Sequence, residues 1–140
     1  MSRNKHSNND SKRFHTWLDN AQEDLIAAQM LITNPRCYKL VAFHCQQALE
    51  KVFKAYVLFK SKKLLDGHNL LWLCKQAIKL DRNFIDYIDE CALINHYYIE
   101  ARYPVDFLCE ISEKKIKKIM RATKEVFDII CEKIYQEYKS

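Results

Sequence analysis

Glycine and proline, the two residues that most often form turns, are nearly absent from this sequence. Its 140 residues include one glycine, Gly67, and two prolines, Pro35 and Pro104. A strand-rich fold needs many tight turns, and tight turns depend on these residue types. The sequence therefore predicts an all-α fold with long helices and few connections. The length is typical of a single domain that buries a hydrophobic core.

Apolar residues recur at three- and four-residue spacing along most of the chain, as they do in helices with one buried face. Pro35 is expected to end the first helix, because proline cannot continue a helix, and Asp81 is expected to cap the fourth. We predict an up-and-down bundle of four long helices and one short helix. The predicted helices span residues 14–33, 38–60, 70–80, 82–100 and 111–138.

The N-terminal segment differs in composition from the rest of the chain. Residues 1–12 contain no apolar side chain after Met1. This predicts a disordered polar leader over residues 1–13, followed by one helical domain over residues 14–138. No apolar run approaches the roughly 20 residues of a membrane span, and the N-terminus lacks the apolar core of a signal peptide. We therefore expect a cytoplasmic protein that does not enter a membrane.

No two of the six cysteines are spaced as Cys-x-x-Cys, the pattern that is typical of zinc ribbons and thioredoxin-like sites. Most of them fall in apolar helical patterns, where a free cysteine packs as a small hydrophobic side chain. We expect reduced, buried cysteines, and neither a metal ion nor a cofactor. The six are Cys37, Cys45, Cys74, Cys91, Cys109 and Cys131.

The net charge of +5 is unevenly distributed along the chain. Residues 36–63 hold seven Lys or Arg side chains and one acid, whereas residues 81–110 hold seven acids and two arginines. Segments of opposite charge either pair within one domain or form separate basic and acidic surfaces. The ordinary alternative is that both segments are solvated helix faces.

The segment "FHCQQALEKVFKA", residues 43–55, places polar side chains inside an apolar helix. Helical spacing arranges them in two neighbouring rows. One row holds His44, Gln47 and Lys51, and the other holds Gln46, Glu50 and Lys54. Semi-buried Gln and His side chains must find hydrogen-bond partners. In one interpretation, the rows form a polar seam that fixes the helix register or a dimer contact. In the other, they form one wall of a nucleotide or RNA site, with Lys51 or Lys54 on a phosphate.

The segment "HYYIEARYP", residues 96–104, lies where the fourth helix is expected to end. Pro104 makes Tyr103 extended. Arg102 can satisfy the last carbonyls of the helix, or it can form a two-pronged contact with a carboxylate or a phosphate. Tyr98 and Tyr103 can stack on a base, although tyrosines on helices more often pack in a core or an interface.

Three segments in this order, "FHCQQALEKVFKA", "HNL" and "YYIEARYP", resemble the HEPN domain family, and "AQEDLIAAQMLI" in the first helix resembles the opening of that family. The resemblance covers residues 14–138. It implies a bundle of four to five helices that forms a homodimer. It also implies a gene beside that of a minimal nucleotidyltransferase, in a system that resembles a toxin–antitoxin pair or a two-part nucleotidyltransferase.

Many HEPN toxins are metal-independent ribonucleases with an Arg-x(4–6)-His motif at a dimer cleft, and this sequence departs from that motif. No histidine follows Arg102, because His96 is the last histidine in the chain. RNA cleavage needs a general base or acid of suitable pKa, which an arginine alone does not supply. The resemblance therefore implies a non-catalytic HEPN protein that binds a nucleotide or RNA, or that is the partner subunit of a minimal nucleotidyltransferase. The expected binding residues are Arg102, Tyr103, Tyr98, His44, Gln47, Lys51 and Lys54.

Two alternatives stay open at this point. One is a HEPN ribonuclease toxin with a rearranged catalytic site of Arg102, His44 and Glu100, which requires the second and fourth helices to face each other. The other is a purely structural helical dimerisation module, in which the motif residues set helix register and interface. Under this second alternative, RNA binds only weakly and loses affinity steeply with salt.

Overall fold

The structure is a computed structural model that describes residues 13–101 and 111–139. In these residues the chain forms five α-helices and two 3₁₀ helices and contains no strand, which confirms the predicted all-α class. The α-helices are α2 (Phe14–Leu31), α3 (Tyr38–Ser61), α4 (Leu70–Leu80), α5 (Ile88–Ala101) and α6 (Glu113–Lys139). The 3₁₀ helices are η1 (Pro35–Cys37) and η2 (Arg82–Tyr87). None of the described helices is long and apolar enough to cross a membrane.

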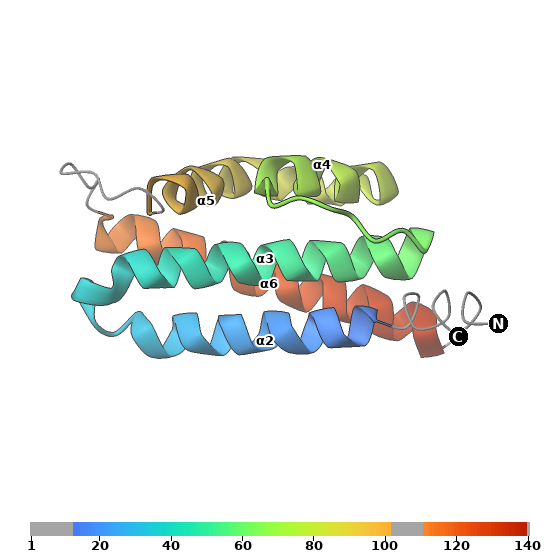
Figure 1. The fold of residues 1–140 in the computed structure, drawn as a ribbon, viewed down its shortest axis with the longest axis horizontal. Coiled ribbons are helices and arrows are strands. Elements are labelled where there is room, and N and C mark those ends of the chain that lie inside the picture. The colour runs from blue at the N-terminus through green and yellow to red at the C-terminus, as the bar shows by residue number, and fades with distance from the viewer. Residues whose placement is uncertain (1–12, 102–110, 140) are drawn as a thin grey trace.

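Helix α3 is the centre of the bundle and contacts each of the other four described α-helices. In Figure 1, α4 and α5 lie above α3 and α2 lies below it, while α6 packs against both α2 and α3. Between Val41 and Leu58, α3 is buried on most of its circumference, because apolar residues occupy nearly all of its faces. The polar side chains of α3 must therefore find partners in the core or at the seams between helices.

The first helix ends at Leu31, slightly earlier than the sequence predicts. The turn that follows is stabilised by Asn34, whose side chain accepts a hydrogen bond of 3.0 Å from the backbone N–H of Arg36. Asparagine favours such turns because its side chain can bond to the backbone two residues ahead. This turn forms η1 and places Arg36 two residues before Tyr38, where α3 begins.

The predicted α-helix over residues 82–100 is wrong in its first part. Residues 82–87 form the 3₁₀ helix η2, and α5 begins only at Ile88. Asp81 is a cap, as predicted, but it caps η2 by accepting a hydrogen bond of 3.0 Å from the backbone N–H of Asn83. Short 3₁₀ helices are common before an α-helix, and this one buries Phe84 in the core at 1% exposure.

The connection between α3 and α4 uses two residues in the left-handed region. Lys62 (φ 61°) caps the end of α3, and Gly67 (φ 107°) adopts a conformation that other residues rarely take. Asn69 then begins α4 by accepting a hydrogen bond of 3.0 Å from the backbone N–H of Trp72. These turns bring His68 back against the middle of α3.

The cysteines of the described residues are free thiols. Cys45, Cys74 and Cys91 are buried in the core, as the apolar pattern around them predicts, whereas Cys37 and Cys131 are half-buried. Burial raises the pKa of the Cys45 thiol to about 12. This thiol therefore stays protonated and packs as an apolar side chain.

Candidate functional site

The row of Gln46, Glu50 and Lys54, which we call the inner row, lies inside the bundle in a hydrogen-bonded network with His68. Glu50 and Lys54 are each 4% exposed. The Lys54 ammonium donates to Glu50 Oε2 at 2.9 Å, and Gln46 Nε2 donates to Glu50 Oε1 at 3.2 Å. His68 Nδ1 lies 2.9 Å from Glu50 Oε2, and the His68 carbonyl accepts a hydrogen bond of 3.1 Å from Gln46. The network ties the start of α4 to the middle of α3.

The electrostatics of the inner row indicate a structural role. Two charges removed from water are stabilised only when partners satisfy them. Burial raises the pKa of the Glu50 carboxyl, but the hydrogen bonds from Lys54, His68 and Gln46 outweigh burial, so the pKa is lowered overall. The Lys54 ammonium also lies 5.4 Å from the ring centre of Trp17, close enough for a cation–π contact. The charge of Lys54 is thus matched within the bundle.

The row of His44, Gln47 and Lys51, which we call the outer row, meets Asp24 of α2 at a partly exposed seam. Asp24 Oδ1 lies 2.9 Å from His44 Nδ1, and Asp24 Oδ2 accepts a hydrogen bond of 2.5 Å from the Lys51 ammonium. The side chains of His44 and Lys51 are 26% and 24% exposed. A carboxylate only accepts hydrogen bonds, so His44 Nδ1 carries a proton. This leaves His44 Nε2 as an acceptor in the neutral ring.

Gln47 joins the two rows, because its Nε2 donates to Gln46 Oε1 at 2.7 Å. The structure therefore joins His44 and Lys51 through Asp24, and joins Gln47 to the inner row. Arg102 and Tyr103, in contrast, lie outside the described residues. Tyr98 and Glu100 lie in α5, where the structure describes their backbone but not their side chains. Over residues 13–101 and 111–139, no three His, Cys, Asp or Glu side chains are grouped to hold a metal ion.

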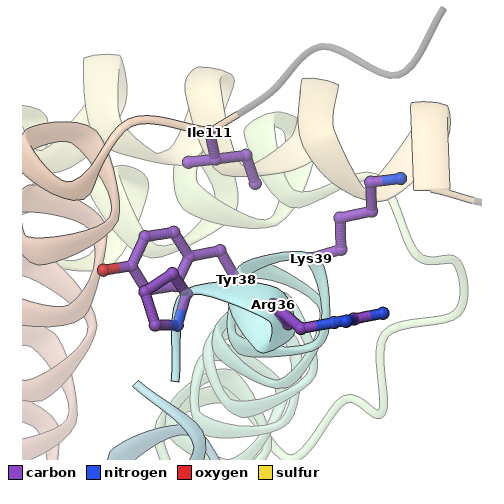
Figure 2. Close-up of a pocket in the computed structure, with 5 residues that line it drawn as sticks. Arg36, Tyr38, Lys39 and Ile111 are labelled. Atoms are coloured by element: carbon purple, nitrogen blue, oxygen red, sulfur yellow. The ribbon is translucent and has the colours of Figure 1, made fainter. Parts of the chain in front are cut away.

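A basic cavity of about 410 Å³ opens at the end of the bundle where α3 begins. Figure 2 shows the side chains of Arg36 and Lys39 extending to the same side, with the Tyr38 hydroxyl directed the other way and Ile111 above them. Arg36 and Lys39 are exposed, whereas Tyr38 and Ile111 are half-buried. We call this site the basic cavity; the described residues that line it are Pro35, Arg36, Tyr38, Lys39 and Ile111.

The basic cavity suits an anionic ligand that also has an apolar part. The arginine guanidinium can bind a phosphate with two parallel hydrogen bonds, and the lysine adds a second positive charge. The cavity also lies at the N-terminus of α3, a helix of 24 residues whose dipole favours negative charge there. Tyr38 and Ile111 offer apolar surface for a base or a sugar. None of the described lining residues is acidic.

Sequence reasoning misses two parts of these sites. It does not identify Asp24 as a partner of α3, although Asp24 lies three residues after Ala21 and next to Leu25, beside the buried face of α2. It also places Arg36 and Lys39 in the basic segment of residues 36–63, but it does not predict that they line a binding site. Their separation by three residues at the start of a helix is the available signal, since such residues lie on one face.

The HEPN domain family model matches residues 14–134 of this chain. A comparison with curated proteins found no match. The family match spans the described helices α2 to α5 and most of α6, and it therefore includes both polar rows and the basic cavity.

Two solved structures share the fold. The crystal structure of TT1696 from Thermus thermophilus is 19% identical in sequence, with a TM-score of 0.69, and the match covers 86% of this chain and 98% of that one. The structure of ST0689, described as an archaeal HEPN homologue, is 21% identical with a TM-score of 0.69, and the match covers 88% of this chain and 98% of that one. At these identities the likeness shows the fold alone, and the family match extends over most of the sequence. The chain belongs to the HEPN domain family.

Proposed function

We propose that this HEPN protein is a non-catalytic binding module that holds the phosphate groups of a nucleotide or of RNA in the basic cavity. The proposal rests on one observation: Arg36 and Lys39 both line a cavity of about 410 Å³. Small-molecule sites in proteins measure about 300–1,000 Å³, so the cavity has room for a nucleotide. The N-terminus of α3 adds a favourable potential for the phosphate.

The test is calorimetric titration of ATP and the other nucleoside triphosphates into the wild-type protein and into the variant Arg36→Gln/Lys39→Gln. Glutamine keeps much of each side chain's length and polarity and removes its charge. We expect the wild type to bind and the double variant to lose at least about tenfold in affinity, because each lost charge-assisted hydrogen bond is worth about 1.5–3 kcal/mol.

Lys75→Gln is the matched control, since Lys75 is an exposed lysine of α4 that does not line the basic cavity. A short single-stranded RNA replaces ATP in a parallel titration, so that a nucleotide ligand and an RNA ligand are told apart. The proposal fails if neither ligand binds, or if Lys75→Gln weakens binding as much as the cavity variant does.

We still predict that Arg102, Tyr103 and Tyr98 contribute to binding the nucleotide, the RNA or a protein partner. The variant Arg102→Ala is predicted to weaken binding of the ligand or of a protein partner and to leave the thermal unfolding midpoint nearly unchanged. An unfolded or strongly destabilised variant would instead assign a structural role to Arg102.

We also propose a homodimer that acts beside a minimal nucleotidyltransferase, in a toxin–antitoxin-like pair. Exposed apolar side chains support an interface on α2, where Ile26 is 47% and Met30 is 73% exposed. The two residues are one helical turn apart and lie on one face. Met30→Lys is expected to convert a dimer into a monomer in light scattering, whereas a dimer that survives this change would remove α2 from the interface.

A second candidate function, a ribonuclease with a non-standard site, is favoured by the contact between Asp24 and His44. A carboxylate that holds one ring nitrogen of a histidine fixes its tautomer and orients the other nitrogen for proton transfer. Asp24 Oδ1 and His44 Nδ1 are 2.9 Å apart, which is the hydrogen-bond distance that this arrangement requires.

Incubation of purified protein with total RNA distinguishes this candidate from the binding module. A ribonuclease would lose cleavage in His44→Ala and lose part of it in Asp24→Asn, which keeps the shape of the side chain and removes its charge. Cleavage that persists in both His44→Ala and Arg102→Ala would come from a contaminant and would exclude this version of the site.

A further inference from the structure

The basic cavity has two chemically different ends. Arg36 and Lys39 carry its positive charge, and Figure 2 shows both side chains extending to the same side. The apolar surface comes from Tyr38 and Ile111, and the Tyr38 hydroxyl is directed to the opposite side from the two cations. A ligand that fills the cavity therefore needs an anionic end and an apolar end, and the two ends can bind in only one order.

The apolar end is held in place by the hydrophobic core. Tyr38 and Ile111 are half-buried and pack against the core cluster of the bundle. Side chains that are packed in this way keep well-defined positions. The ring of a fixed tyrosine is a suitable surface for a nucleobase, because every base has a flat face that can stack on it.

The two cations of the other end act separately. Their charged groups are apart from each other in Figure 2. Neither Arg36 nor Lys39 has an ion-pair partner in the part of the chain that the structure describes. An arginine fork holds one phosphate with two parallel hydrogen bonds. The ammonium of Lys39 is then available for a second phosphate.

The size of the cavity favours a single nucleotide over a strand of RNA. Its volume of about 410 Å³ is near the lower end of the range for small-molecule sites. In a nucleoside diphosphate or triphosphate, all phosphates are linked at one end of the molecule and the base is at the other. In RNA, each phosphate is separated from the next by a ribose that carries its own base. The two ends of the cavity match the first arrangement.

We propose that the basic cavity binds a nucleoside diphosphate or triphosphate in one orientation. The base and ribose lie against Tyr38 and Ile111, one phosphate is on Arg36, and the next phosphate is on Lys39. This inference rests on the function proposed above, and it narrows the ligand to nucleotides with at least two linked phosphates. A monophosphate leaves Lys39 without a partner, and inorganic tripolyphosphate leaves the apolar end empty.

The experiment is calorimetric titration of adenosine, AMP, ADP, ATP, inorganic tripolyphosphate and a short RNA without terminal phosphates into the full-length protein. ATP and ADP are expected to bind most tightly. AMP should bind about tenfold more weakly than ATP or worse, because it lacks one charge-assisted contact. Adenosine and the RNA should also bind more weakly than ATP.

Two variants test the orientation. Lys39→Gln should weaken ATP binding by about tenfold and AMP binding much less, so that the advantage of ATP over AMP is largely lost. Tyr38→Leu should weaken ATP binding by about fivefold or more, because it removes the stacking surface, and should leave tripolyphosphate binding unchanged. Normal tripolyphosphate binding also shows that this variant is folded. Tyr135→Leu is the matched control, since Tyr135 is an exposed tyrosine of α6 that does not line the cavity.

The outcomes separate this inference from the function on which it rests. If none of these ligands binds, the proposed function fails and the inference fails with it. If ATP binds and Arg36→Gln/Lys39→Gln weakens it, the proposed function holds. The inference alone is then overturned if AMP or the RNA binds as tightly as ATP, if Lys39→Gln weakens AMP and ATP equally, or if Tyr38→Leu affects ATP no more than tripolyphosphate.

Discussion

The inner and outer rows of α3 start two residues apart in the sequence and have different environments in the structure. In the inner row, Glu50 and Lys54 are each 4% exposed and bond to each other, and the exposed ring of His68 bonds to Glu50 at the edge of the network. In the outer row, His44 and Lys51 meet Asp24 at a seam that solvent reaches. A rotation of about 100° per residue along a helix is enough to produce this difference.

The comparison shows that two polar rows of one helix can differ in burial. Buried charges must be satisfied by partners. Gln46, Lys54 and His68 all bond to Glu50, so the inner row has few hydrogen-bonding groups left for a ligand. The side chains of His44 and Lys51 in the outer row are partly exposed, and Arg36 and Lys39 line the basic cavity at the start of the same helix. The buried network and the proposed binding site thus lie at different positions along one helix.

The largest expected effect comes from breaking the inner row. Glu50→Ala leaves the Lys54 ammonium buried without its partner and should lower the free energy of unfolding by about 3–5 kcal/mol. Chemical denaturation measures this change. The double variant Glu50→Leu/Lys54→Met removes both charges and should recover most of the loss. A cost below about 1 kcal/mol for Glu50→Ala would fit an exposed ion pair and contradict the burial of Glu50 and Lys54.

Breaking the outer row should cost less. Asp24→Ala removes the partner of His44 and Lys51, but both of these side chains can turn to solvent. We expect the free energy of unfolding to fall by about 1–2 kcal/mol, measured by the same denaturation method. A loss as large as that of Glu50→Ala would show that the two rows do not differ in the way described.

The pH dependence of stability sharpens the comparison further. The pKa of Glu50 in the folded protein lies below its usual value of 4.5, so its contribution to stability is fully present above that value and is lost as the pH falls through the lowered folded pKa. The gap in unfolding temperature between wild type and Glu50→Gln should be constant near neutral pH and narrow below 4.5. A gap that widens in acid would mean that the folded pKa is raised instead.

The smallest effect on stability is expected at the basic cavity. Arg36→Gln/Lys39→Gln changes exposed side chains with no described ion-pair partner, and such surface changes usually alter the free energy of unfolding by no more than about 0.5 kcal/mol. Thermal unfolding tests this directly. A large loss of stability would show that Arg36 and Lys39 stabilise the fold. Weaker ligand binding by the same variant could then result from unfolding and would not identify the binding site.

Most of the fold can be predicted from local patterns, because helical periodicity and the lack of turn residues act over short stretches. The predicted helices over residues 38–60 and 70–80 lie within a residue of α3 and α4. The 3₁₀ helix η2 is not predicted, because its geometry depends on the burial of Phe84 against the rest of the bundle. An apolar spacing alone does not distinguish a 3₁₀ turn from the first turn of an α-helix.

The candidate sites can be predicted less well, because they join distant parts of the chain. The rows of α3 are visible as polar residues in an apolar helix, but Asp24 and His44 are 20 positions apart and meet only through the packing of α2 on α3. The basic cavity needs Ile111 beside Arg36 and Lys39. Which helices become neighbours is a property of the whole bundle and is not contained in any one segment.

The most direct test of the central claim is an amide NMR titration of ¹⁵N-labelled protein with ATP, which reports where a ligand binds. We expect the signals of residues 36–39 and Ile111 to shift, and those of the inner row around Glu50 and Lys54 to stay in place. Shifts centred on His44, Lys51 and Asp24 would instead place the ligand at the outer row and contradict binding at the basic cavity. The absence of any shift at millimolar ATP would contradict nucleotide binding at the basic cavity.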